Sequence, residues 1–326
     1  MQPLVFEPYL RPQIWGGRQL QDVFGRQLPG TGPIGESWEI SAHRLHVSRV
    51  AEGPLIGRLL TDLWRDQRRE LDGQDESDDA PFPWLIKFLD CQRPLSVQVH
   101  PDAPTAARLC PDESGKAEAW VVLEAAAAAW NSAGLQPGVT RESLRQALDN
   151  DTVIDCLHRF VPQVGECIYS MPGTVHAMSG PLLLYEVQQT SDATFRLFDW
   201  NRTGLDGQPR RLHVNESLDA INWTLGPVRP VEPQPSSLRL PNVEVSRLLC
   251  GLGFQLDRLR TDGAFESPFG DRMSVWTVSR GTAELVQSGY RRTFRRGDTV
   301  LIPASAGAIQ WCPTAEVELL AVTDCE

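Results

Sequence analysis

The chain has 326 residues, of which 41% are hydrophobic and 22% charged, the composition of a globular protein long enough for two domains. Its net charge of −11 argues against nucleic acid as a partner, because that binding depends on a basic surface. No apolar run reaches the roughly 18 residues of a membrane span, so no membrane partner is expected.

The N-terminus and the cysteines predict a cytoplasmic protein. Met1 to Glu7 lacks the basic start and long apolar stretch of a signal peptide. The seven cysteines are an odd number without a Cys-x-x-Cys pair, which argues against a disulfide scaffold and against a cysteine zinc site. We therefore expect reduced thiols.

Short β-branched runs between Pro and Gly predict a mainly β architecture. The acidic stretch 72–79 predicts a solvated loop, since it lacks the glycine and the terminal glutamate of a calcium loop. Thr140 is a candidate cap for a helix through Leu148, and a second short helix is predicted over Thr152 to Phe160. These two helices would form an insertion at about residues 138–162.

The proline-rich segment 226–237 predicts a linker. Four strands are predicted beyond it, at residues 275–278, 283–286, 297–304 and 317–322. We expect this second, smaller β domain to lack metal ligands, because no histidine follows His213.

Three separated segments offer a set of metal ligands. Leu95 to Pro101 alternates with a period of two, which places Ser96, Gln98 and His100 on one face of a strand. Lys116 and Glu118 share a face in the next strand, and His176 follows the turn signal at Pro172-Gly173. Gln98, His100, Glu118 and His176 form a mixed nitrogen and oxygen set that suits Zn²⁺ or another divalent transition ion and leaves positions open for substrate.

A family resemblance follows from these stretches together with Trp15-Gly16-Gly17, Gly35 to Ser41, Phe82 to Asp90 and Glu186 to Arg196. In order and combination they resemble the type I mannose-6-phosphate isomerases in their short bacterial form. The resemblance implies a cupin (jelly-roll) catalytic domain over residues 1–235 and a cupin-like domain over 236–326. It also implies interconversion of mannose 6-phosphate and fructose 6-phosphate, with one zinc held by the four candidate ligands. Relatives often place the proline of the turn two or three residues before the glycine, so the turn type at Gly173 stays open.

The catalytic roles stay open among Lys87, Lys116 and Arg196. Lys87 lies in an apolar run, where burial would lower its pKa for acid–base work, although it can also extend to solvent. Lys116 is a candidate acid–base or phosphate contact, or an ion-pair partner of Glu118. The resemblance places Arg196 in the active site, where its donors suit phosphate or an oxyanion, although a surface ion pair is the alternative. Ser96 is a candidate hydrogen-bond donor to substrate. Structural roles are predicted for Glu36, Glu39, His43, His46, His158 and His213, which lie outside the ligand spacing.

Two alternative functions remain at this point. An iron-dependent cupin oxygenase is disfavoured by Gln98, because such iron sites more often use histidine and carboxylate alone. A sugar-phosphate sensor without catalytic activity would not require Lys87 and Lys116. In each case the partner is a small molecule, a phosphosugar under the leading interpretation, and the protein is expected to be a monomer or a homodimer.

Overall fold

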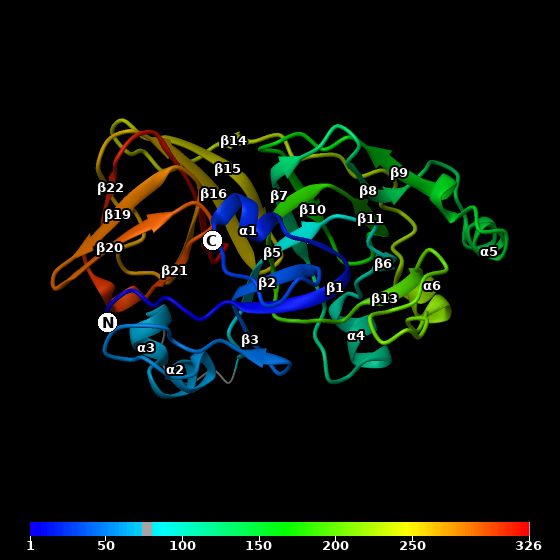
Figure 1. Cartoon of the computed structure of the whole chain (residues 1–326), viewed down its shortest axis with the longest axis horizontal. Helices are drawn as coiled ribbons and strands as arrows, with labels where there is room; N and C mark the ends of the chain where they lie inside the picture. The colour runs from blue at the N-terminus through cyan, green and yellow to red at the C-terminus, as the bar shows by residue number, and fades with distance from the viewer. Residues whose placement is uncertain (74–79, 326) are drawn as a thin grey trace. The chain divides into compact units, whose positions relative to one another are not determined.

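The computed structural model describes residues 1–73 and 80–325 and is built mainly from β-strands (Figure 1). It divides into two compact units. Unit 1 comprises Met1–Tyr9, Glu39–Trp84 and Glu232–Glu326, and unit 2 comprises Leu10–Trp38 and Leu85–Val231. We expected one division at residue 235. The chain enters its C-terminal segment of unit 1 at Glu232, and this unit also takes in two N-terminal segments.

Two packed sheets form most of unit 2. The six-stranded sheet has the order β1 (Tyr9–Gly17), β2 (Ile34–Ile40), β5 (Trp84–Cys91), β12 (Leu182–Gln189), β7 (Glu118–Ala125) and β10 (Cys167–Ser170). The five-stranded sheet has the order β13 (Phe195–Phe198), β6 (Val97–Val99), β11 (His176–Ser179), β8 (Trp130–Leu135) and β9 (Leu157–Phe160). Leu89, Trp120 and Ile168 of the first sheet pack in one core with Ala133 and Met178 of the second. Each sheet therefore buries an apolar face against the other.

Helices cover the outer face of the five-stranded sheet. Leu144 of α5 (Arg141–Asp149) and Leu218 of α6 (Val214–Ala220) share a core with Val97 and Val99. Thr140 caps α5 as predicted, because its side chain accepts the hydrogen bond of the Ser143 amide. Unit 2 also contains α1 (Gln19–Phe24) and α4 (Ala103–Leu109).

The second predicted helix, over Thr152 to Phe160, is wrong in its larger part. Only Val153–Cys156 forms a short 3₁₀ helix, η1, and the next four residues form β9. In β9, Arg159 pairs with Ser132 and Phe160 with Asn131 of β8. Pairing at the open edge of the sheet outweighs the weak local helix signal.

The predicted linker at residues 226–237 is bonded to the sheets along its length. The amides of Val228 and Val231 donate to the carbonyls of Ala133 and Cys167 within unit 2, at 3.0 and 2.7 Å. The chain then forms the short edge strand β14 (Gln234–Pro235) of unit 1. Prolines suit this edge position, where one side of the strand needs no partner.

Unit 1 also contains two sheets. One has the order β14, β15 (Glu244–Gly251), β16 (Phe254–Thr261), β23 (Val317–Thr323), β18 (Ser274–Arg280) and β21 (Thr299–Ile302). The other has the order β17 (Phe265–Glu266), β22 (Gln310–Pro313), β19 (Thr282–Gln287) and β20 (Tyr290–Arg295). The four strands predicted beyond the linker are confirmed as β18, β19, β21 and β23. The same unit holds β3 (Ala42–His43), β4 (His46–Val47), α2 (Leu60–Asp66), α3 (Arg68–Asp72) and η2 (Ala304–Ala306).

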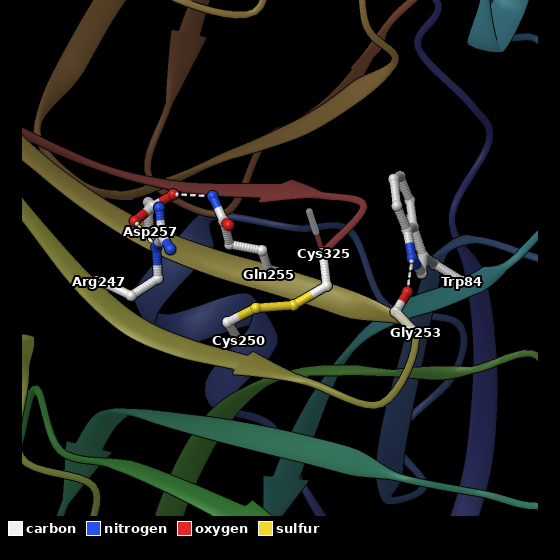
Figure 2. The surroundings of a disulfide bond; sticks show 7 residues. All are labelled: Trp84, Arg247, Cys250, Gly253, Gln255, Asp257 and Cys325. Carbon is white, nitrogen blue, oxygen red and sulfur yellow. Dashed lines mark hydrogen bonds and ion pairs between the residues drawn. A yellow bond between two sulfur atoms is a disulfide. The ribbon is translucent and has the colours of Figure 1, made fainter. Parts of the chain in front are cut away.

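One pair of cysteines departs from the expected reduced thiols. Cys250 in β15 forms a disulfide with Cys325, which follows β23, across a sequence separation of 75 residues (Figure 2). β16 lies between these two strands, so strand order brings the cysteines together, and their spacing in the sequence gives no sign of it. The other five cysteines, all among the described residues, form no disulfide. The nearby hairpin is also held by Trp84, whose indole donates to the Gly253 carbonyl at 2.8 Å.

The loop predicted over 72–79 falls outside the described residues from position 74 to position 79. Among the residues that are described, every helix is too short or too polar to cross a membrane.

Candidate metal centre

A cavity of about 410 Å³ lies in unit 2 and is lined by side chains from both of its sheets. All eight site residues predicted from the sequence belong to this region: seven line the cavity, and the eighth, His100, contacts the lining residues Lys116 and Glu118. The polar lining residues are Arg11, Gln13, Glu36, Lys87, Ser96, Gln98, Lys116, Glu118, His176, Glu186, Asp192, Thr194, Arg196, Arg210 and His213. A cavity of this size and polarity accommodates a small polar ligand.

Three of the predicted ligands converge on one point. One ligand atom from each of His100, Glu118 and His176 lies within 4.8 Å of the other two. Nε2 of His100 is 3.2 Å and Nε2 of His176 is 3.3 Å from Oε1 of Glu118. Gln98 lies beside them, but it is the side-chain nitrogen, a donor and not a metal ligand, that is 3.1 Å from Nε2 of His176. The three residues of the cluster are at most 2% exposed.

The remaining ring nitrogens fix the direction of both histidines. Nδ1 of His100 donates to the Ala193 carbonyl at 2.6 Å, and Nδ1 of His176 donates to the Thr174 carbonyl at 3.0 Å. Each Nε2 is thereby directed toward Glu118, as in histidines that bind metal. Oε1 of Glu118 is buried and lacks a hydrogen-bond partner within residues 1–73 and 80–325. A divalent cation would satisfy this oxygen, and the donor set fits zinc.

Strand register explains how the ligands meet. Gln98 of β6 lies directly opposite His176 of β11 on one side and opposite Arg196 of β13 on the other. Figure 1 shows these three strands beside one another, with α6 next to β13. Glu118 comes from the facing sheet, at the start of β7. The centre is therefore closed by two sheets that pack face to face.

The turn before His176 requires its glycine. Gly173 has a φ of +86°, and a Cβ there would lie 2.7 Å from the Asn222 amide nitrogen. Its own amide donates to the His100 carbonyl at 2.8 Å, and the Thr174 amide donates to the Met171 carbonyl at 3.0 Å. The turn is thus built with Pro172 directly before the glycine, and it ties the two histidine segments together.

Lys116 contacts the candidate ligands directly. Its Nζ is 2.8 Å from Oε2 of Glu118 and 3.2 Å from Nε2 of His100. Gly115 lets the chain approach closely here, because a Cβ at that position would lie 2.6 Å from the Ala103 amide nitrogen. The ion pair with Glu118 weighed for Lys116 is therefore formed.

Burial sets the protonation of the centre. It lowers the pKa of His100, and it lowers the pKa of His176 from 6.5 to about 3, so both imidazoles are neutral and able to bind metal. Burial alone would raise the pKa of Glu118, but its interactions with the His100 ring and with the Lys116 ammonium group hold it well below its usual value. Glu118 is therefore an ionised carboxylate.

Lys87 differs from its expected ionisation. Its Nζ lies 3.5 Å from Oε1 of Glu186 and 3.9 Å from Oε2 of Glu36. Burial would lower its pKa, but the two carboxylates outweigh burial and raise it, so the predicted lowering is wrong. Burial raises the pKa of Glu186 to about 8 despite Lys87. Lys87 and Lys116 are also the only two lysines in the sequence, a signal that sequence reasoning overlooked.

Two residues predicted to be structural line the cavity. Glu36 accepts hydrogen bonds from the Gln13 amide at 2.6 Å and the Trp38 indole at 2.7 Å, and it pairs with Arg11 at 3.3 Å. His213 accepts the hydrogen bond of the Arg196 amide at 3.2 Å. Both therefore lie beside the candidate site, and the structural role expected for them stays a prediction. The alternation of Glu36 and Trp38 along one strand was the available signal for Glu36.

Ser96 and Arg196 are the remaining predicted site residues, and both line the cavity. Ser96 donates to the side-chain oxygen of Gln98 at 3.0 Å, so it contacts a candidate ligand. Arg196 donates to the Arg211 carbonyl at 3.2 Å. Glu39, buried in unit 1, is absent from the cavity lining, and none of His43, His46 and His158 lines it among the described residues.

Comparison with known proteins identifies the family. A model described as phosphomannose isomerase type I, catalytic domain, matches residues 4–127. The mannose-6-phosphate isomerase ManA of Bacillus subtilis is 31% identical over 94% of both chains, and that of Streptococcus mutans is 31% identical over 98% of both. The chain belongs to the type I phosphomannose isomerase family. This membership agrees with the resemblance found in the sequence.

Solved structures of phosphomannose isomerases share the fold. The mannose 6-phosphate isomerase from Bacillus subtilis matches with a TM-score of 0.89 and 27% identity over 99% of both chains. A mannose 6-phosphate isomerase bound with zinc and yttrium matches with a TM-score of 0.75 and 16% identity. The predicted mainly β, cupin-type fold is thereby confirmed.

Proposed function

We propose that this protein is a zinc-dependent aldose–ketose isomerase that interconverts mannose 6-phosphate and fructose 6-phosphate. The observation that carries the proposal is the buried cluster of His100, Glu118 and His176 with the Lys116 amine beside it. The cavity of about 410 Å³ has room for a hexose phosphate. Relatives covering nearly the whole chain are named as isomerases of this sugar phosphate.

The donor set supports zinc as the ion. Two neutral imidazoles and a carboxylate offer three ligands, and the Gln98 side-chain oxygen would be a fourth with its amide turned toward the ion. Coordination by solvent or substrate oxygens would complete the shell. When bound, a divalent ion supplies Lewis-acid polarisation of the substrate oxygens and stabilises the negative charge of an enediol-type intermediate. Zinc suits a reaction without net electron transfer, because it has no redox chemistry.

The chain's own residues supply proton transfer and binding. Lys116 carries the proton from C2 of the aldose to C1, while a hydroxyl proton passes from O2 to O1, so no proton is gained or lost overall. Its position beside two ligands supports this role over Lys87, whose raised pKa keeps it a cation between Glu36 and Glu186. Arg196 offers donors to the phosphate.

Location and assembly stay predictions. We propose the cytoplasm as the location, where sugar phosphates are retained, although the Cys250–Cys325 disulfide is uncommon in a reducing compartment. A monomer or homodimer is proposed as the assembly, because all residues of the site come from one chain.

The test of the proposal is Lys116→Met in the metal-loaded enzyme. We expect bound metal to be retained and kcat for fructose 6-phosphate formation to fall by about 10²–10⁴-fold, the usual contribution of acid–base catalysis. Arg280→Ala is the matched control, since that side chain is 75% exposed in unit 1 and forms a surface pair. A near-normal kcat in Lys116→Met would show that Lys116 has a structural and not a catalytic role.

Two other results would overturn the proposal in favour of one of the alternative functions. Oxygen consumption with iron bound and without isomerisation would support the oxygenase. Binding of mannose 6-phosphate without exchange of its C2 proton with solvent would support the sensor. Because the chain has only two lysines, an amine-selective reagent also offers a direct check, since substrate should protect Lys116 from labelling.

A further inference from the structure

A buried carboxylate holds two arginines, one of which lines the cavity. Asp199 is 5% exposed. Arg210 donates to it through Nε at 2.7 Å and Nη2 at 2.6 Å, and Arg202 donates through Nη2 at 2.9 Å. Arg210 is one of the residues that line the cavity. Asp199 takes up Nε and Nη2 and leaves the donors of Nη1, which can bind a ligand in the cavity.

The backbone beside Asp199 adopts an unfavourable conformation that builds this arrangement. Trp200 and Asn201 have φ values of 59° and 50°, in the left-handed region that residues with a Cβ seldom occupy. The Trp200 indole donates to the Leu95 carbonyl at 2.6 Å and holds the turn. Such strain occurs most often at functional sites, where surrounding contacts compensate for it. Here the turn directs Arg202 back onto Asp199.

The charges in this region are unbalanced toward positive. Asp199 pairs with both Arg202 and Arg210, and Arg196 adds a third guanidinium nearby. The other carboxylate that acts on Arg196 is Asp192, which already pairs with Arg11 at 3.8 Å, so the cations outnumber the carboxylates in this group. Nε of Arg196 is buried without a hydrogen-bond partner in the described part of the chain. Burial lowers the pKa of Arg196, and the nearby charge of Arg210 lowers it further, so the two cations repel each other. An anion between them would relieve that repulsion.

We propose that Arg210 and Arg196 together bind the phosphate of the sugar phosphate, and that Asp199 is a positioning residue that acts through Arg210. The inference rests on the proposed function and adds Arg210 as a residue that determines specificity for phosphorylated substrate. Asp199 accepts hydrogen bonds from two nitrogens of the Arg210 guanidinium and thereby fixes the plane of that group. The fixed fork presents Nη1 with little loss of side-chain freedom on binding. The two arginines would thus give a chain of net charge −11 a local positive site for an anion.

The first experiment compares Arg210→Ala with wild type in the metal-loaded enzyme. We expect KM for mannose 6-phosphate to rise at least tenfold and kcat to stay within threefold, because the phosphate is remote from the reacting carbons. Arg210→Lys should recover part of the loss, since the charge remains but the fork is gone. Arg280→Ala, outside the cavity, should leave both constants unchanged. Equal falls in kcat and kcat/KM, with KM unchanged, would overturn the assignment of Arg210.

The second experiment tests the positioning role of Asp199. Asp199→Asn should raise KM less than Arg210→Ala, again without a loss of kcat, and the double variant should be no worse than Arg210→Ala alone. Additive losses would show that Asp199 does not act through Arg210. Circular dichroism and the thermal midpoint establish that each variant is folded, and Arg210→Ala tests the phosphate site even if Asp199→Asn unfolds.

Calorimetry with inorganic phosphate separates this inference from the proposed function. Wild-type enzyme should bind phosphate, and Arg210→Ala should bind it at least tenfold more weakly, whether or not any sugar is isomerised. Phosphate binding without isomerisation would reject the proposed reaction and keep the anion site. Isomerisation with unchanged phosphate binding in Arg210→Ala would reject the anion site and keep the reaction.

Discussion

The glycine in the turn before His176 offers a quantitative test of how the metal centre is built. Gly173 has a φ of +86°, and a Cβ there would lie 2.7 Å from both the amide nitrogen and the Cβ of Asn222. Gly138 has a φ of +85°, but a Cβ there would meet nothing within 4 Å. Alanine at either position has the same unfavourable backbone, whereas only alanine at 173 also has a steric clash.

The expected losses of unfolding free energy follow from this difference. The left-handed conformation costs an alanine about 1–2 kcal/mol, so Gly138→Ala should lose about that amount. Gly173→Ala adds an overpacking cost of about 1–3 kcal/mol, for a total of about 2–5 kcal/mol. Urea unfolding of the two metal-free variants and wild type, side by side, measures both quantities.

The same substitution should weaken metal binding. The Gly173 amide donates to the His100 carbonyl, and the turn leads directly into His176, so a displaced turn moves both histidines. Loss of such support around ligands usually costs about 10–100-fold in metal affinity. Competition with a chelator should show this loss in Gly173→Ala and unchanged affinity in Gly138→Ala. Equal stability and equal zinc affinity in the two variants would refute the role given to the turn.

Three further predictions concern covalent and ionic contacts. Cys250→Ser should lose about 4.5 kcal/mol of unfolding free energy, the chain-entropy value for a link across 75 residues. A reductant should then have no further effect on the stability of this variant. Seven titratable thiols in the unreduced, denatured wild type would contradict the link to Cys325. Lys87→Met should keep bound metal but lose up to about 3–5 kcal/mol of unfolding free energy, because the ionised Glu36 loses a buried cation. An unchanged urea midpoint would contradict this. Burial raises the pKa of Tyr290 from 10.0 to about 12. Between these two values the folded chain keeps a proton that the unfolded chain releases, so the unfolding free energy should fall as pH rises. Tyr290→Phe should remove this pH dependence in urea titrations at successive pH values.

Local sequence patterns were sufficient to place the candidate ligands. The period-two strand put Gln98 and His100 on one face, and the turn signal at Gly173 marked His176. These features depend on neighbours in the sequence, where strand alternation and backbone conformation leave few choices. The mainly β class followed in the same way from short strands and turns, whereas the cupin fold followed from the family resemblance.

The other residues of the cavity depend on which strands pair. β2 and β12 flank β5, so Glu36 and Glu186 meet around Lys87 although 150 positions separate them in the sequence. Strand order of this kind is a property of the whole sheet and is not encoded in any one segment. The raised pKa of Lys87 was missed for this reason, because only the apolar neighbours of its own strand were visible. The Cys250–Cys325 disulfide was not predicted for the same reason, because the order of strands β15, β16 and β23 brings the two cysteines together.

The most direct test of the account is metal content measured together with isomerase turnover. Wild-type protein should bind one zinc per chain and convert mannose 6-phosphate to fructose 6-phosphate, and a chelator should abolish turnover that zinc then restores. His100→Ala and His176→Ala should lose metal and activity together. Stoichiometric zinc in both variants, or full turnover in metal-free wild type, would contradict the account.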